Sequence, residues 1–211
     1  MRKYAFIIPV VVILLLLGAV LYVGTRVSNW LSGPDPETVA SGTLQSVREQ
    51  ARLTPLAARF VAVVTSEQSR FGLSARKTLI MPGLVRYEVD LARIRQEDLD
   101  WDGATNTLSI TLPPIEIAGP EIDLNQVQEY GGGGVLTALT NAERVLDQAN
   151  RQAAQRELLR QAREPMPMRL ARQAAKRAVA RSFAMPLRAA GIEATVQVRF
   201  ADDPSAEPSH L

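Results

Sequence analysis

An uncharged, strongly apolar segment near the N-terminus constrains this chain more than any other feature of its sequence. Residues 4–24 contain no Asp, Glu, Lys or Arg, and residues 6–17 consist mainly of Ile, Val and Leu. A helix needs about 20 such residues to cross the ~30 Å hydrocarbon core of a bilayer. The pattern therefore predicts a transmembrane helix over residues 4–24, with Tyr4 and Tyr22 at the level of the headgroups.

A cleaved signal peptide is the alternative interpretation of this segment. The apolar core of a signal peptide usually spans about 7–15 residues and is followed by a small-x-small cleavage site. Here the apolar run is longer, and Leu21, Tyr22 and Val23 occupy positions where small residues would be required. We therefore expect an uncleaved signal-anchor that holds the protein in the lipid bilayer.

The charges beside the segment predict its orientation. Arg2 and Lys3 precede it, whereas only Arg26 follows it closely. Because Lys and Arg are retained on the cytoplasmic side, residues 1–25 are expected to form a cytoplasmic tip and a single-pass anchor in the cytoplasmic membrane. The rest of the chain is then extracytoplasmic. In a bacterium with two membranes, this location is the inner membrane with the domain in the periplasm.

The composition removes several kinds of active site from consideration. The chain has no cysteine, and its one histidine is His210, next to the C-terminal residue. Disulfide frameworks, cysteine nucleophiles, Ser-His-Asp triads and histidine-rich zinc sites are therefore not expected. With 24 basic and 22 acidic residues, the net charge of +2 indicates no nucleic-acid partner. No catalytic, cofactor-binding or metal-binding residue is assigned, and no cofactor is expected.

Beyond the anchor, the chain divides into three further parts. Residues 26–52 begin with the Gly-, Pro- and Ser-containing segment Ser28–Pro36 and continue as a thin helical pattern to Arg52. We interpret them as a linker and a stalk helix. Residues 53–203 show strand and helix periodicities and are expected to form one extracytoplasmic α+β domain. The polar residues 204–211 are expected to be a disordered tail.

Two-residue alternation of apolar and polar side chains predicts most of the strands. Leu56–Thr65 is rich in β-forming residues, and Leu79–Met81 leads into Pro82-Gly83. This pair suits the central positions of a type II turn, because proline fixes φ and glycine accepts a positive φ. We therefore predict a turn there, followed by a strand from Val85 to Leu91.

Three further segments extend this pattern. Leu108–Leu112 alternates in the same way, and Pro113-Pro114 is expected to end this strand because proline cannot donate to a ladder. Ile115–Ile117 and Glu121–Asp123 are expected to continue the pattern around a bend at Gly119-Pro120. The clearest alternation in the chain, Ile192–Phe200, predicts a final strand.

A helical block separates the last strand from the others. Thr140–Glu143 has the capping-box pattern that starts a helix, and this helix is expected to reach Arg163, before Pro165 and Pro167. A second helix is predicted from Met168 to Ala190. Strands, then two helices, then a returning strand predict an α+β fold in which an antiparallel sheet packs against a helix pair.

Two details of the helix pair bear on its packing. Pro186 is expected to kink the second helix, and Gly191 to end it. The first helix carries a narrow apolar seam that suits either self-association or packing on the sheet, and packing is the simpler interpretation. The residues of this seam are Ala142, Leu146, Ala149 and Ala153.

The order of these motifs resembles that of the family named domain of unknown function 4230. The resemblance covers residues 45–200 and rests on an anchor followed by Pro82-Gly83, Asp90-Leu91, Leu112-Pro113 and Glu121-Ile122-Asp123, then an Ala- and charge-rich helix pair and a short last strand. It implies the same fold held at a membrane. It transfers no activity, cofactor or site residue.

The segment Asp98–Gly103 reproduces the first half of a calcium-binding EF-hand loop. Asp98, Asp100 and Asp102 supply carboxylates at alternate positions, and a glycine follows. The position where calcium needs a bidentate glutamate is Ser109, and a strand rather than a helix follows the loop. A solvated hairpin tip is therefore the alternative interpretation.

Other features also have both a functional and a structural interpretation. Trp101 suits either ligand stacking or the edge of the core. Gly131–Gly134 lacks the Lys-Ser/Thr of a phosphate loop and favours a mobile connection. Residues 81–130 carry three basic and ten acidic side chains, whereas residues 141–190 carry eleven basic and four acidic ones. The basic helices suit either a solvated surface or contact with anionic headgroups.

Together these patterns predict a non-enzymatic structural or interaction module of the cell envelope, at the outer face of the inner membrane. Its expected partners are the lipid bilayer, through residues 4–24, and either anionic headgroups, a second copy or another protein. The alternative is a metal-dependent enzyme or calcium-binding domain that uses Asp98, Asp100 and Asp102.

Overall fold

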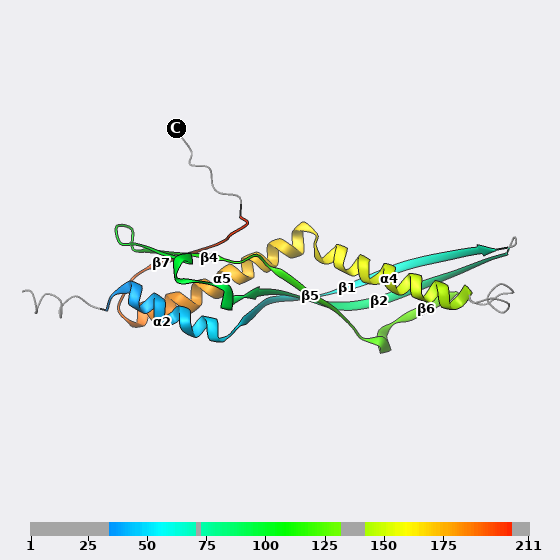
Figure 1. Ribbon diagram of the computed structural model, residues 1–211, viewed down its shortest axis with the longest axis horizontal. Coiled ribbons are helices and arrows are strands. Elements are labelled where there is room, and N and C mark those ends of the chain that lie inside the picture. Colours follow the sequence, from blue (N-terminus) through cyan, green and yellow to red (C-terminus); the bar gives the residue numbers. More distant parts are fainter. Residues whose placement is uncertain (1–33, 71–72, 132–141, 204–211) are drawn as a thin grey trace, which may run out of the picture.

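The computed structural model describes residues 34–70, 73–131 and 142–203, which form an elongated body (Figure 1). The predicted anchor at residues 4–24 and the predicted tail at residues 204–211 lie outside the described residues. No helix among the described residues combines the length and the apolarity needed to cross a bilayer. The fold class is α+β, with two C-terminal helices and a final strand, as predicted.

A long antiparallel hairpin runs along most of the body. β1 (Arg52–Arg70) pairs with β2 (Leu73–Asp90) from end to end, and the register places Pro82 directly opposite Val61. The chain therefore reverses between the two strands and passes straight through the Pro-Gly pair. The turn predicted at Pro82-Gly83 is wrong.

Packing explains why proline and glycine are tolerated inside β2. The edge of β2 away from β1 pairs with β6 (Gln128–Gly131) before this point and with β5 (Glu116–Ile122) after it. Pro82 lies in the gap between these partners, where that edge has no ladder for a missing N–H to interrupt. At Gly83 a Cβ atom would lie 2.8 Å from Leu158 Cδ1. The missing side chain therefore lets a helix lie close against the strand.

The strands form two sheets with different pairing. β5 continues across Gly119-Pro120, as predicted, and completes a four-stranded sheet with β1, β2 and β6. β3 (Leu99–Asp102), β4 (Thr107–Leu112) and β7 (Thr195–Phe200) form a three-stranded sheet in which β7 runs parallel to β4. The prediction of a purely antiparallel sheet is therefore wrong. β7 returns after long helices, and such a crossover allows parallel pairing.

Two consecutive helices cover the sheets. α4 (Ala142–Ala162) packs on β1 and β2, and α5 (Pro165–Ala189) packs on β1, β7 and the N-terminal helix α2 (Pro36–Glu49). α4 and α5 follow each other end to end along the body (Figure 1). α5 starts earlier than predicted, because Pro165 takes the first helical position, where no N–H is needed. It also continues through Pro186.

The helix predicted to be a stalk belongs to the folded domain, which therefore starts at α2 and not at residue 53. Asp35 caps α2 by accepting a hydrogen bond from the Thr38 N–H at 3.2 Å. One row of its side chains is buried in the largest apolar cluster, which joins α2, α5 and the three-stranded sheet. Its members include Ala40, Leu44, Val47, Val89, Leu91, Ile94, Leu108, Ile110, Leu112, Phe183, Leu187 and Phe200.

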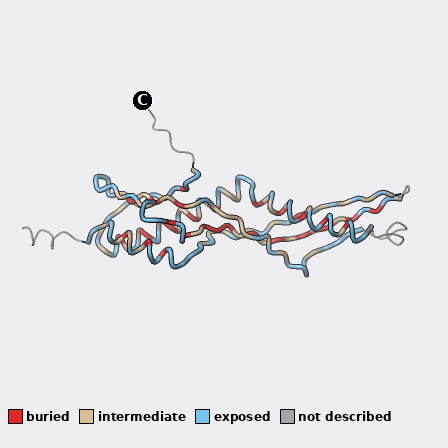
Figure 2. The backbone as a smooth tube through the Cα atoms, in the orientation of Figure 1, coloured by how far each residue is buried: buried red, intermediate tan, exposed pale blue. Residues whose placement is uncertain are grey.

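The core becomes thinner from this end toward the hairpin tip. Tyr87 is buried beside the start of α5 and donates a hydrogen bond to the Ala162 carbonyl at 2.8 Å. Farther along, a smaller cluster includes Leu79, and among the described residues near the tip Ala75 and Leu146 form a cluster of two. Figure 2 shows this buried row along the hairpin. A thin core lowers the local free energy of opening, so we expect the described part of the hairpin around Ala75 to open more readily than the part around Tyr87.

The face of α4 that packs on the hairpin differs from the predicted seam. Ala149 is exposed and Ala153 is half-buried, so of the described seam positions only Leu146 is deeply buried. Asn150 breaks the apolar pattern, and its Nδ2 donates to the Lys77 carbonyl at 2.9 Å. The buried row repeats every four residues and comprises Leu146, Asn150, Ala154, Leu158 and Ala162.

A cluster of ion pairs fastens β7 to α5. Asp203 accepts hydrogen bonds from Lys176 Nζ at 2.6 Å, Arg172 Nη2 at 2.7 Å and the Phe200 N–H at 2.9 Å. Burial by itself raises the pKa of Asp203, but these hydrogen bonds outweigh it, and the pKa lies well below its ordinary value. The charged form of Asp203 therefore stabilises the fold.

Replacing Gly83 with Ala tests the close approach of α4 to β2. The added Cβ overlaps Leu158, and we expect the free energy of unfolding, measured by urea titration, to fall by about 1–3 kcal/mol. The control is Gly42→Ala in α2, where an added Cβ meets nothing within 4 Å. This control should raise the stability by about 0.5–1 kcal/mol. A Gly83→Ala variant as stable as the wild type would contradict the packing.

Asp203→Asn tests the ion-pair cluster through its pH dependence. Because the folded-state pKa is depressed, the contribution of Asp203 is present above its ordinary pKa of 3.8 and is lost as the pH falls below it. We expect the variant to be less stable by about 1–3 kcal/mol at pH 7 and to lose less of its melting temperature than the wild type at more acidic pH. Asp100→Asn, on the exposed side of β3, is the control. Parallel acid profiles for Asp203→Asn and the wild type would refute this role.

Candidate functional site

One face of the four-stranded sheet points away from α4 and α5. Opposite residues of an antiparallel pair share a face, and successive residues alternate between faces. Ala62, Leu79 and Met81 point toward α4 and are buried. The alternate residues form a surface that we call the open face. It includes Arg59, Val61, Val63 and Thr65 of β1, which lie opposite Leu84, Pro82, Ile80 and Thr78 of β2.

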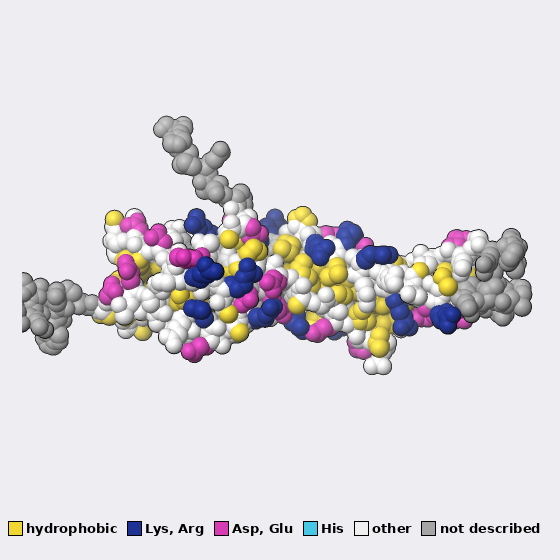
Figure 3. Space-filling model, viewed as in Figure 1, with side chains coloured by type: hydrophobic (Ala, Val, Ile, Leu, Met, Phe, Trp, Pro, Cys, Tyr) yellow, Lys and Arg dark blue, Asp and Glu magenta, His cyan; other side chains and the backbone are white. Residues whose placement is uncertain are grey.

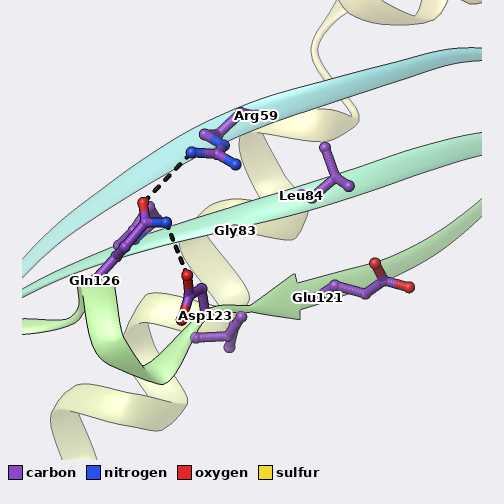
Figure 4. Close-up of a pocket in the computed structure, with 8 residues that line it drawn as sticks. Arg59, Gly83, Leu84, Glu121, Asp123 and Gln126 are labelled. Atoms are coloured by element: carbon purple, nitrogen blue, oxygen red, sulfur yellow. Dashed lines mark hydrogen bonds between the residues drawn. The ribbon is translucent and has the colours of Figure 1, made fainter.

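The open face has an apolar half toward the hairpin tip. Val61 is 47% exposed and Val63 is 62% exposed, although both are large hydrophobic side chains. Ile80, Pro82 and Leu84 beside them are half-buried. Figure 3 shows the molecule from the side of Figure 1, on which α4 lies in front of the hairpin, whereas the close-up in Figure 4 looks onto the open face with the helix behind the strands. A contiguous apolar patch of this kind is typical of a binding surface.

The other half of the open face is charged. Glu88 accepts hydrogen bonds from Arg52 at 3.0 Å and from Arg86 at 3.1 Å. Arg52 also pairs with Glu116 at 3.2 Å, and Arg86 pairs with Glu121. The bonds from Arg52 and Arg86 lower the pKa of Glu88, so its charged form is favoured. The five side chains therefore connect β1, β2 and β5 as a set of mutually paired charges.

A shallow hollow of about 270 Å³ lies where the two halves meet. Here the chain leaves β5 through the 3-10 turn η3 (Leu124–Gln126). Figure 4 shows Arg59 of β1 reaching toward Gln126, which in turn contacts Asp123, with the helix behind the strands. Arg59 Nη1 donates to Gln126 Oε1 at 3.4 Å, and Gln126 Nε2 donates to Asp123 Oδ2 at 2.8 Å.

The polar groups of this hollow are suited to contact rather than to proton transfer. The Asn125 N–H and the Gln126 side chain lower the pKa of Asp123, so its carboxylate is a weak base. Gln126 joins this carboxylate to Arg59. The hollow thus offers a ligand the apolar side chains of Pro82 and Leu84 within a rim of bridged charges.

A buried polar cluster lies on the opposite side of the sheet, beneath α4. Lys77 is only 5% exposed, and its Nζ contacts Glu129 at 2.7 Å and also Asp147. Burial by itself lowers the pKa of Lys77, but the hydrogen bonds with these carboxylates outweigh it, and the pKa lies above its ordinary value. A nucleophilic lysine needs a lowered pKa, so Lys77 instead connects β2 to β6 and α4. No motif marks Lys77; the one signal in the sequence is that it falls in phase with the buried Ala75 and Leu79.

The structure does not bring the three aspartates of the predicted calcium loop together as metal ligands. Asp98 accepts a backbone hydrogen bond within its own 3-10 turn at 2.8 Å, and Asp102 caps the hairpin turn by accepting from the Ala104 N–H at 2.9 Å. Asp100 lies on the exposed side of β3. Among the described residues, no three His, Cys, Asp or Glu side chains are grouped so that they could hold a metal ion. Trp101 packs against the main core, as in the structural interpretation.

Two remaining sequence features have structural roles where they are described. Gly131 ends β6 with a φ of 82°, a conformation that favours glycine, and residues 132–134 of the glycine run lie outside the described residues. Arg172 of α5 pairs with Asp202 and Asp203, so part of the basic charge of the helices is neutralised within the fold.

Comparisons with known proteins identify a family for this fold. No curated protein and no solved structure matches the chain. Residues 45–198 match the family described as "Protein of unknown function (DUF4230)", which confirms the resemblance seen in the order of the motifs. Because the match extends over most of the chain, this protein belongs to the DUF4230 family.

Proposed function

We propose that this protein is a non-enzymatic interaction module of the cell envelope, anchored in the cytoplasmic membrane by residues 4–24, and that it binds its partner through the open face. The observation that carries the proposal is the exposure of Val61 and Val63 beside a row of half-buried apolar side chains. Covering this surface with a partner removes apolar area from water, which favours association.

The ionisable groups around the sheet support binding rather than catalysis. Catalytic acids and bases have pKa values shifted toward the working pH. Here the pKa of Glu88 and of Asp123 is lowered and that of Lys77 is raised, so each shift favours the ordinary charged form. A partner would therefore meet fixed charges beside an apolar patch, as in many protein-binding surfaces.

The shape of the body suits a domain that presents this face at a distance from an anchor. The described chain begins at the α2 end, and the hairpin tip lies at the opposite end of the body (Figure 1). At about 3.3 Å per residue, the 19 residues of β1 span about 60 Å. An anchor that precedes α2 would hold the body by the end opposite the hairpin tip.

The membrane anchor is tested with a reporter enzyme fused after Leu211 that is active only outside the cytoplasm. We expect full reporter activity, because the charges around residues 4–24 favour a cytoplasmic N-terminus. Mass analysis of the mature chain should show that these residues are retained. An inactive reporter, or a mature chain that begins beyond Val23, would contradict the anchored topology.

The role of the open face is tested by replacing Val61 and Val63 together with threonine, which keeps the shape and β-propensity of valine. In crosslinked native membranes, we expect the wild type to run as a complex larger than its 23.1 kDa chain and the double variant to lose most of it. The free energy of unfolding should change by less than about 1 kcal/mol, because both side chains are exposed.

The matched control is Val145→Thr, since Val145 is 50% exposed but lies on α4, away from the open face. This variant should retain the complex. A complex that survives in the Val61/Val63 variant, or a wild type that runs only at the mass of one chain, would rule out the proposed binding surface.

A further inference from the structure

The outer edge of β1 is a second exposed feature, distinct from the open face itself. Among the described residues, β1 pairs with β2 on one side and with no strand on the other. The Val61 carbonyl accepts a hydrogen bond from Gln161 Nε2 at 3.2 Å, while its cross-strand partner Pro82 has no N–H to donate. The backbone groups of Val61 therefore point toward the free edge. Because such groups alternate along a strand, those of Arg59, Val63, Thr65 and Glu67 point the same way.

β1 contains Pro55 and a bulge between Leu53 and Leu56, but beyond them its edge carries few of the devices that usually prevent one strand from pairing with another. Protected edge strands are short, or contain proline, lysine or inward-pointing charges. Residues 56–69 contain no proline, glycine or lysine, and their only charged side chains are Arg59 and Glu67. Both of these residues are exposed rather than directed into the core. The edge is therefore suited to accept a further strand.

We propose that β1 pairs antiparallel with β1 of a second copy of this chain, about a twofold axis at Val63. Arg59 and Glu67 carry opposite charges and lie equally far from Val63 in the sequence. A twofold pairing centred on Val63 therefore places Arg59 of each copy opposite Glu67 of the other. It also places Val61 opposite Thr65. Twofold registers centred on the other outward-pointing residues set these charges opposite neutral residues or opposite their own copies, and gain no ion pair between Arg59 and Glu67.

The pairing joins the two four-stranded sheets into one continuous sheet. Because the axis is perpendicular to the sheet, both open faces lie on the same side, and the apolar halves around Val61 and Val63 meet at the centre. The α2 ends of the two copies lie at opposite ends of the assembly, so two anchors in one membrane place the assembly along the membrane surface. In the dimer, the Thr65 N–H of the second copy replaces Gln161 as the donor to the Val61 carbonyl.

This inference rests on the proposed function and names its partner as a second copy. The first test uses Val63→Cys in the full-length chain, expressed in its native membrane. Opposite residues in a hydrogen-bonded antiparallel pair have Cα atoms about 5.5 Å apart, which is within disulfide range. Since the natural chain has no cysteine, the new thiol is the only one present. Mild oxidation should convert most of the chain into a disulfide-linked dimer.

The control for this experiment is Met185→Cys, because Met185 is 72% exposed but lies on α5. It should remain at the mass of one chain under the same oxidation. Equal dimer formation by both variants would show random collision and overturn the proposal. Crosslinking of Val63→Cys to a different protein, or no crosslinking at all, would also overturn it.

Charge reversal in the Val63→Cys background tests the register. Arg59→Glu and Glu67→Arg should each lower the dimer fraction by about fivefold or more, because two like-charge contacts replace two ion pairs. The double variant should restore the dimer. Arg76→Glu is the control: Arg76 pairs with Glu67 within the hairpin at 3.0 Å but takes no part in the proposed contact, so its dimer fraction should not fall. If the dimer fraction of the double variant is no higher than that of either single variant, the proposed register is wrong.

The two proposals fail in distinguishable ways. If Val63→Cys gives no dimer but the complex still depends on Val61 and Val63, self-pairing is wrong and the interaction role stands. If the complex does not depend on the open face either, both proposals are wrong.

Discussion

The pairing of β1 with β2 is the interaction on which the other elements depend. Two strands alone are marginally stable in water, and a hairpin of this length needs a cover on at least one face. α4 and the start of α5 supply that cover, with Leu158 lying against Gly83 and Ala162 accepting from the buried Tyr87. The remaining strands are attached to β2 or gathered with α2 at one end. The body is consequently long and narrow, with a core that thins toward the tip.

Covering one face leaves the other in solvent, and this asymmetry underlies the functional proposals. In the charged half of the open face, the side chains around Glu88 pair with one another. In the apolar half, Val61 and Val63 remain exposed to solvent. A partner can cover the apolar half without breaking the ion pairs around Glu88. The free edge of β1 adds directional backbone groups beside the same patch, so one surface combines apolar area with a template for pairing.

The parts of the fold that follow from local periodicity were predictable, and the parts that depend on distant contacts were not. The alternation of Ile192–Phe200 and the helix-stopping residues near Arg163 gave elements close to those observed. The turn predicted at Pro82-Gly83 was wrong because the local sequence of a Pro-Gly pair favours a turn in any context. In the fold, the gap between β5 and β6 and the position of Leu158 allow this pair to lie inside a strand. The sequence shows that Val61 and Val63 are apolar. It does not show which face of their strand a helix will cover, so the exposure of these residues could not be predicted.

The sequence by itself determined the class of the fold, the apolar N-terminal segment, the order of strands and helices and the membership of the DUF4230 family. These features depend on residue type and spacing within short stretches of chain. Only the tertiary structure decided that β7 runs parallel to β4, that α2 belongs to the core and that Lys77 is buried among carboxylates. Each of these arises from contacts between residues far apart in the chain, and their geometry is set by packing rather than by local preference.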